Sequence, residues 1–79
     1  MWEHGVIEIP LGRGKVARCE FWAKVYEEGS EFGINGGRIS KLSIKLNGKE
    51  TCNYERGWDI RPTDEATKQA YDLIIKAFN

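Results

Sequence analysis

The feature that most constrains this chain is an Asn-Gly pair between two runs of alternating residues. Apolar residues occupy even positions in residues 42–46, LSIKL, and they return at even positions after the pair, at Cys52, Tyr54, Trp58 and Ile60. Period-two alternation around Asn-Gly is a strong signal of a β-hairpin. Residues 36–60 are therefore predicted to form two antiparallel strands joined by a tight turn.

The phase of the two runs predicts the form of the turn. A two-residue loop at 47–48 pairs Leu46 with Lys49, and so places Ile44 and Cys52 on opposite faces of the sheet. A three-residue loop at 46–48, with Gly48 as a left-handed bulge, places them on the same face. Because a half-buried sheet keeps its apolar side chains on one face, we expect the bulged three-residue loop.

The flanking segments supply the other elements. Alternation predicts a first strand that Pro10 ends and a second strand that carries Phe21 on its inner face. Pro62 ends the last strand, Thr63 is placed to cap a helix, and the helix has one apolar stripe formed by Ala66, Ala70, Leu73, Ile74 and Ala77.

The predicted fold is α+β, a four-stranded antiparallel meander with one C-terminal helix packed on one face. The expected strands cover about 2–9, 15–27, 38–46 and 49–60, and the expected helix covers about 64–78 of a single 79-residue domain. The Gly-rich segment 28–37 is expected to be a loop, either functional or pinned to the core by Phe32. One face of the sheet is left without a helix.

Composition narrows the classes of function. The chain has 12 Lys plus Arg and 12 Asp plus Glu, so its net charge is zero and no global field points to nucleic acid. Cys19 and Cys52 match neither a disulfide scaffold nor a zinc-ligand spacing, and they are expected to be buried thiols of a reducing, cytoplasmic location. No apolar run reaches the roughly 18 residues of a membrane span, and residues 1–4 do not resemble a signal peptide.

The face without a helix carries the first candidate site. Trp22, Lys24 and Tyr26 fall on the outer face of the second strand. These aromatic residues either cover the open sheet, for example by packing on Trp2, or anchor a partner.

Arg56 and Trp58 form a second candidate site. Alternation places Arg56 on the face of Tyr54 and Trp58, and Gly57 is expected to allow a bulge or a close backbone approach. Arg56 then either stacks at the rim of the core or serves as a phosphate or carboxylate clamp.

A third candidate site is basic. Residues 36–49 include four basic residues and no acid, namely Arg38, Lys41, Lys45 and Lys49. Beside Trp22 and Tyr26 they would form a stacking platform for single-stranded nucleic acid or a nucleotide. Nearby Glu residues favour a charge-balanced, solvated face instead.

Three strings carry a resemblance to a known family. FGI at 32–34, GRISKL at 37–42 and YERGWD at 54–59 resemble a family of small uncharacterised proteins, a domain of unknown function of Gram-positive bacteria, their phages and mobile elements. The resemblance runs from about Trp22 to the C-terminus. It implies a cytoplasmic protein and names no activity or ligand.

These features together predict a non-enzymatic interaction protein. His4 is the only histidine, no nucleophile and base are paired in the pattern, and no cofactor, metal or catalytic residue is expected. The expected partner is another protein or a second copy as a homodimer, with nucleic acid as the alternative and no membrane. The candidate binding residues are Trp22, Lys24, Tyr26, Arg38, Lys41, Lys45, Arg56 and Trp58.

Overall fold

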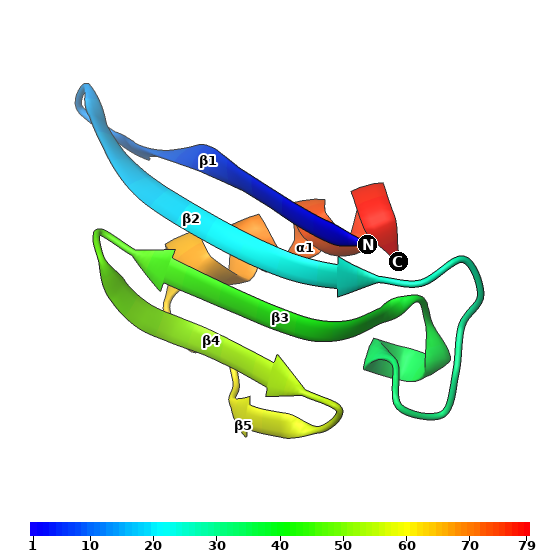
Figure 1. Ribbon diagram of the computed structural model, residues 1–79. Helices are drawn as coiled ribbons and strands as arrows, with labels where there is room; N and C mark the ends of the chain where they lie inside the picture. The colour runs from blue at the N-terminus through cyan, green and yellow to red at the C-terminus, as the bar shows by residue number, and fades with distance from the viewer.

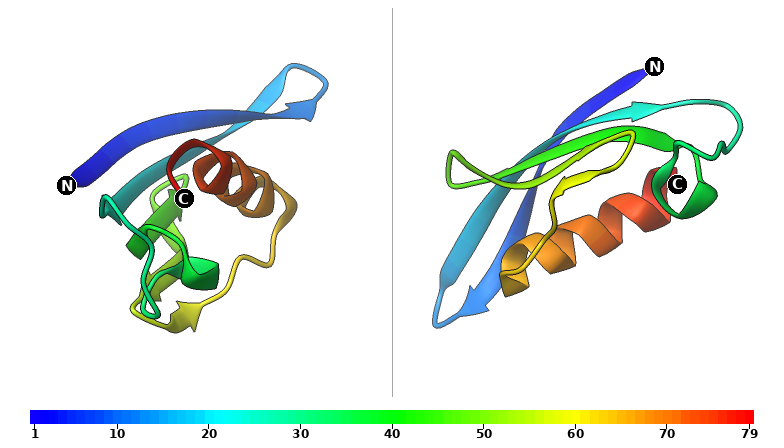
Figure 2. Two further views of the ribbon diagram at one scale, coloured as in Figure 1. Left: turned by 90° about the vertical axis from the view of Figure 1, so that its right-hand side faces the viewer. Right: turned by 90° about the horizontal axis from the view of Figure 1, so that it is seen from below.

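The computed structural model describes residues 1–79 and shows one antiparallel sheet with a helix against one face (Figure 1). The strands pair in sequence order, so the predicted meander is confirmed, with β1 and β5 at the edges. The strands are β1 (Trp2–Gly12), β2 (Lys15–Val25), β3 (Ile39–Leu46), β4 (Lys49–Glu55) and β5 (Trp58–Ile60). The helix α1 (Glu65–Phe78) lies on one side only, as both views in Figure 2 show.

The sheet has five strands, so the prediction of four is wrong. The predicted strand 49–60 reverses at Arg56, which has a left-handed φ of 60°, and Tyr54 pairs directly with Trp58. A three-residue loop keeps residues of equal parity on one face, so alternation alone does not distinguish a reversal from a continuous strand. Arg56 was predicted to share the face of Tyr54 and Trp58, and this is wrong, because Arg56 lies in the loop between β4 and β5.

The turn between β3 and β4 also differs from the prediction. Its loop has two residues, Asn47 and Gly48, with φ of 50° and 88°, and Leu46 pairs with Lys49. The ladder then shifts by one residue around Thr51, between the pairs Lys45↔Glu50 and Ile44↔Cys52. The bulge therefore lies inside β4, and it still brings the apolar residues of both strands onto one face.

Strand β1 continues past Pro10 to Gly12, although Pro10 was expected to end it. Pro10 is paired with Val16 across the ladder. An edge strand tolerates proline, because only one side of its backbone needs hydrogen bonds from the sheet.

The core lies between the sheet and α1. Both thiols are buried there, as predicted, and Phe78 of the helix packs on Phe21 with ring centroids 6.0 Å apart. The buried apolar residues are Ile9, Ala17, Cys19, Phe21, Ala23, Ile34, Ile39, Leu42, Ile44, Cys52, Tyr54, Ala66, Ala70 and Ile74.

The helix is rotated from the predicted stripe. Leu73 is 49% exposed and Ala77 is exposed, whereas Thr67 is fully buried. The Thr67 hydroxyl pairs with the Thr51 hydroxyl at 2.7 Å, which allows a polar side chain to face the sheet. The helix cap is Asp64 rather than Thr63, because the Asp64 carboxylate accepts the Thr67 N–H at 2.8 Å.

The loop between β2 and β3, residues 26–38, is fastened to the end of α1. Ile34 is buried, and the side chain of Asn79 accepts the N–H of Ile39 at 2.9 Å and donates to the carbonyl of Ile34 at 3.0 Å. Phe32 is 43% exposed, so Ile34 and not Phe32 pins the loop to the core. Figure 2 shows this loop beside the C-terminal end of the helix.

Candidate binding surface on the helix-free face

The ladder register arranges the side chains of the helix-free face in three rows across the sheet. The rows are Trp2, Lys24, Lys41 and Glu55; His4, Trp22, Ser43 and Asn53; and Val6, Glu20, Lys45 and Glu50. Aromatic and charged residues therefore share this face, and Trp2 and Trp22 are not among the residues that form the core or pack against it.

Each aromatic residue of this face lies close to a basic side chain. The Trp22 ring stacks on His4, with centroids 4.9 Å apart and planes inclined by 14°, and the Lys45 Nζ lies 5.5 Å from the Trp22 centroid. The Lys24 Nζ lies 6.0 Å from the ring of Trp2 and 5.5 Å from that of Tyr26. Hydrogen bonding to Lys24 lowers the pKa of the Tyr26 hydroxyl.

The acidic residues of the face are already bound by neighbours. The Glu20 carboxylate is 2.8 Å from the His4 ring nitrogen, and the Glu55 carboxylate is 3.3 Å from the Lys41 Nζ. Glu50 accepts hydrogen bonds from Ser43 and Asn53, which lower the pKa of its carboxyl group. The formal charges of the three rows balance, but Lys24 and Lys45 form no ion pair, so their ammonium groups are free to bind a carboxylate.

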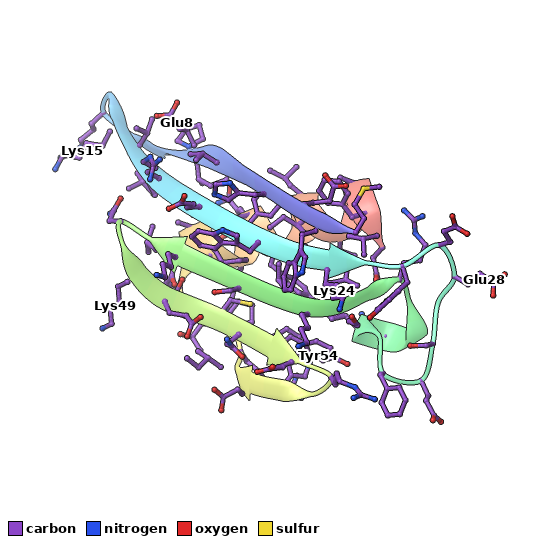
Figure 3. All side chains as sticks on the ribbon, viewed as in Figure 1. Glu8, Lys15, Lys24, Glu28, Lys49 and Tyr54 are labelled. Atoms are coloured by element: carbon purple, nitrogen blue, oxygen red, sulfur yellow. The ribbon has the colours of Figure 1, made fainter.

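A basic hollow of about 470 Å³ lies where the helix-free face meets the loop 26–38. Figure 3 shows Lys24 on the helix-free side of β2 and Glu28 on the loop that follows. The residues that line this hollow are Lys24, Tyr26, Glu28, Ser30, Phe32, Ser40, Lys41 and Arg56. We call this site the basic hollow.

The structure brings four of the eight predicted site residues into the basic hollow, namely Lys24, Tyr26, Lys41 and Arg56. Trp22 and Lys45 lie farther along the same face. Two others lie elsewhere. Arg38 donates to the carbonyl of Phe78 at the end of α1, at 3.1 Å, and Trp58 packs between Tyr54 and Tyr71 on the helix side.

Sequence reasoning missed the residues that the loop and the bulge contribute. Ser40 is the extra residue where the β2–β3 ladder shifts between Lys24 and Val25, and Ser30 and Phe32 come from the loop. A period-two pattern carries no signal for a bulge or for the path of a loop. His4, to which the sequence assigned no role, is the stacking partner of Trp22.

The two cysteines offer no nucleophile to this surface. Both are fully buried on the helix side, and burial raises the pKa of Cys52 to about 12. No group of three His, Cys, Asp or Glu residues is placed to hold a metal ion.

Because the Cys52 thiol is buried, we expect the protein to lose stability at alkaline pH. The ordinary pKa of a thiol is 9.0, so an unfolded Cys52 ionises near pH 9, whereas burial raises the pKa of the folded thiol to about 12. Above pH 9 the unfolded state therefore releases a proton that the native state retains, and one such group lowers the free energy of unfolding by up to about 1.4 kcal/mol per pH unit. Urea unfolding at pH 8 to 10.5 measures this slope.

The control for this slope is Cys52→Ala, which removes the titrating group. Its free energy of unfolding should be lower at pH 8 but should fall less steeply above pH 9. Equal slopes for the two proteins would contradict the assignment to Cys52.

One protein-family model matches the whole chain. Residues 1–79 match the model described as domain of unknown function DUF7678. The chain belongs to this family. The predicted resemblance to an uncharacterised domain is confirmed, and it extends over β1 and β2 as well as the segment from Trp22.

No curated protein and no solved structure matches this member of DUF7678. Its helix is neither long nor apolar enough to cross a membrane. The function of this DUF7678 chain must therefore be inferred from the geometry of its own surface.

Proposed function

We propose that the protein is a non-enzymatic binding protein that acts through its helix-free face. One observation carries the proposal. Trp2, Trp22 and Tyr26 lie on that face, although the core is complete without them. Trp2 is 56% exposed and Tyr26 is 47% exposed. Aromatic side chains are the usual anchors of interfaces, because one ring buries a large area at a low cost in entropy.

The partner that fits this face is a protein surface with carboxylates beside apolar side chains. Lys24 and Lys45 are the lysines of this face that form no ion pair, and each lies over an exposed or half-buried aromatic ring. A carboxylate of the partner can bind the ammonium group while a neighbouring apolar side chain covers the ring. The cytoplasmic location and the bacterial or mobile-element origin implied by the resemblance belong to this proposal.

Single-stranded nucleic acid is the second candidate partner. Rings paired with lysines, Trp22 with Lys45 and Tyr26 with Lys24, are the units that single-strand binders use for bases and phosphates. It ranks second because the face also carries Glu20, Glu50 and Glu55 and the chain has a net charge of zero. A polyanion would meet both signs of charge.

The test compares the wild type with Trp22→Ala/Tyr26→Ala as baits in lysate of the native host. A protein held by the wild type is then purified and titrated against both forms. We expect about 1000-fold weaker binding by the variant, since two interface aromatics that each contribute about 2 kcal/mol together account for about 4 kcal/mol. Circular dichroism verifies that the variant is folded.

Leu73→Ala provides the matched control, because Leu73 is an exposed apolar residue of α1 on the other side of the molecule. It should bind the partner as the wild type does. Equal binding by Trp22→Ala/Tyr26→Ala would contradict the proposal. Titration with a 20-residue oligothymidine at low salt tests the second candidate, and strong quenching of tryptophan fluorescence would favour nucleic acid instead.

A further inference from the structure

We propose that the basic hollow binds a phosphate monoester with a planar organic group, of the class of a nucleoside monophosphate. This goes beyond the protein-binding role, because the ligand is small and needs no macromolecular partner. The proposal rests on four features of the hollow: a pair of opposed lysines, a fixed arginine, a matching charge and an adjacent indole ring.

The first feature is a pair of like charges. Lys24 of β2 and Lys41 of β3 are direct cross-strand partners, and both line the hollow. Like charges directly opposite each other destabilise a sheet. Lys41 has Glu55 at 3.3 Å on its other side, but Lys24 forms no ion pair. An anion bound between the two ammonium groups would offset their repulsion.

The second feature is the fixed orientation of Arg56. Its backbone is left-handed, with φ of 60°, and its N–H donates to the carbonyl of Ser40 at 2.9 Å. Its guanidinium lies 4.3 Å from the centroid of the Phe32 ring. Phe32 is in turn held by Tyr54, whose hydroxyl donates to the Phe32 carbonyl at 2.8 Å. A guanidinium held in this way is suited to bidentate recognition of phosphate.

The third feature is a matching charge and size. Three basic residues and one acid, Glu28, line the hollow, so its lining carries a formal charge of +2. A phosphate monoester carries about −1.5 to −2 at pH 7. The hydroxyl groups of Tyr26, Ser30 and Ser40 add neutral donors. A volume of about 470 Å³ suits a small molecule.

The fourth feature is a second, shallower hollow next to the first. Lys41 lines both, and the second hollow of about 190 Å³ is also lined by Trp2, Ser43, Asn53 and by Glu55, the ion-pair partner of Lys41. The exposed indole of Trp2 offers a flat surface for a base whose phosphate lies beside Lys41 and Arg56. This arrangement distinguishes a nucleotide from inorganic phosphate.

The test is calorimetric titration of the purified chain at low salt with three probes: inorganic phosphate, AMP and adenosine. We expect AMP to bind at least about 10-fold more tightly than phosphate, and adenosine to bind more weakly than AMP. We take a dissociation constant of roughly 10 mM as the weakest affinity of interest. If AMP does not bind at concentrations up to about 10 mM, the proposal is overturned. Equal affinity for AMP and phosphate would overturn the assignment of the ring to Trp2.

Two variants locate the site. Arg56→Asn removes the guanidinium but keeps a residue that tolerates left-handed φ, and Lys41→Gln removes one ammonium group. Each should weaken AMP binding at least about 10-fold. Lys15→Gln, an exposed lysine at the opposite end of β2 and outside the hollow, is the charge-matched control, and it should change the affinity less than about twofold. An equal loss in all three variants would show non-specific attraction and would overturn the site.

Because this titration uses only the purified chain, its outcome is independent of partner capture. If the wild-type chain binds a captured protein but does not bind AMP, only the proposal of a nucleotide site in the basic hollow is rejected. AMP binding without any captured protein would support the hollow and reject the protein-binding role.

Discussion

Ile44→Ala is expected to remove about 3 to 5 kcal/mol from the free energy of unfolding. Ile44 is fully buried at the centre of the sheet, paired with Phe21 on one side and Cys52 on the other. Rigid strand neighbours on both sides cannot collapse into the space that the lost methyl groups leave. A domain of 79 residues is typically stable by only about 4–12 kcal/mol, so this single change removes a large share of the total.

Urea unfolding followed by circular dichroism measures this effect, with an unchanged m-value as the sign that the native state stays compact. The control is Leu73→Ala, a truncation of similar size on α1. Leu73 is 49% exposed, so we expect a loss below about 1 kcal/mol. Comparable losses for the two variants would show that α1 packs with the face first predicted from the sequence.

Gly33→Ala is expected to destabilise the protein by about 3 kcal/mol and to deform the basic hollow. Gly33 has an ordinary φ of −77°, so its need for glycine comes from space and not from handedness. A Cβ atom at this position would overlap the carbonyl oxygen of Gly37, which is backbone and cannot rotate away. The loop would have to shift, and with it Ser30 and Phe32, which line the hollow.

The matched control is Gly57→Ala. The sequence suggested that Gly57 allows a close backbone approach, but no atom lies within 4 Å of an added Cβ there. Its φ is not left-handed, so alanine should be neutral or slightly stabilising. Thermal unfolding of both variants, together with AMP titration of Gly33→Ala, measures the effects. A Gly33→Ala protein with wild-type stability would mean that the loop adopts a different path.

Alternation and turn chemistry predicted most of the fold. Apolar residues at even positions of β3 and β4 placed Leu42, Ile44, Cys52 and Tyr54 on one face, and they form the core as expected. The bulge needed to reconcile the two strands was also implied by their phase. Its place was not, because a bulge in the turn and a bulge at Thr51 restore the same alternation.

The candidate site was predicted in part for a similar reason. Lys24 and Tyr26 were assigned to the helix-free face by parity, and Lys41 by its position in the predicted hairpin. Arg56 also lines the basic hollow, although its predicted face was wrong. The chain reverses at this residue, and its side chain lies beside Phe32 of the loop 26–38. Arg38 and Trp58 are not part of the hollow. Arg38 binds the carbonyl of Phe78 at the end of α1, and Trp58 packs against Tyr71 of the same helix.

The sequence by itself determined that Phe21, Leu42, Ile44, Cys52 and Tyr54 face the core, because strand geometry enforces a period of two over short distances. Only the tertiary structure decided where strands reverse, how α1 is rotated and how the loop 26–38 runs. Those choices depend on contacts between distant residues, such as the Thr51–Thr67 hydroxyl pair and the hydrogen bonds of Asn79 to Ile34 and Ile39. The basic hollow likewise depends on contacts between distant residues, because Arg56, Phe32 and Ser40 come together with Lys24 and Lys41 only in the folded chain.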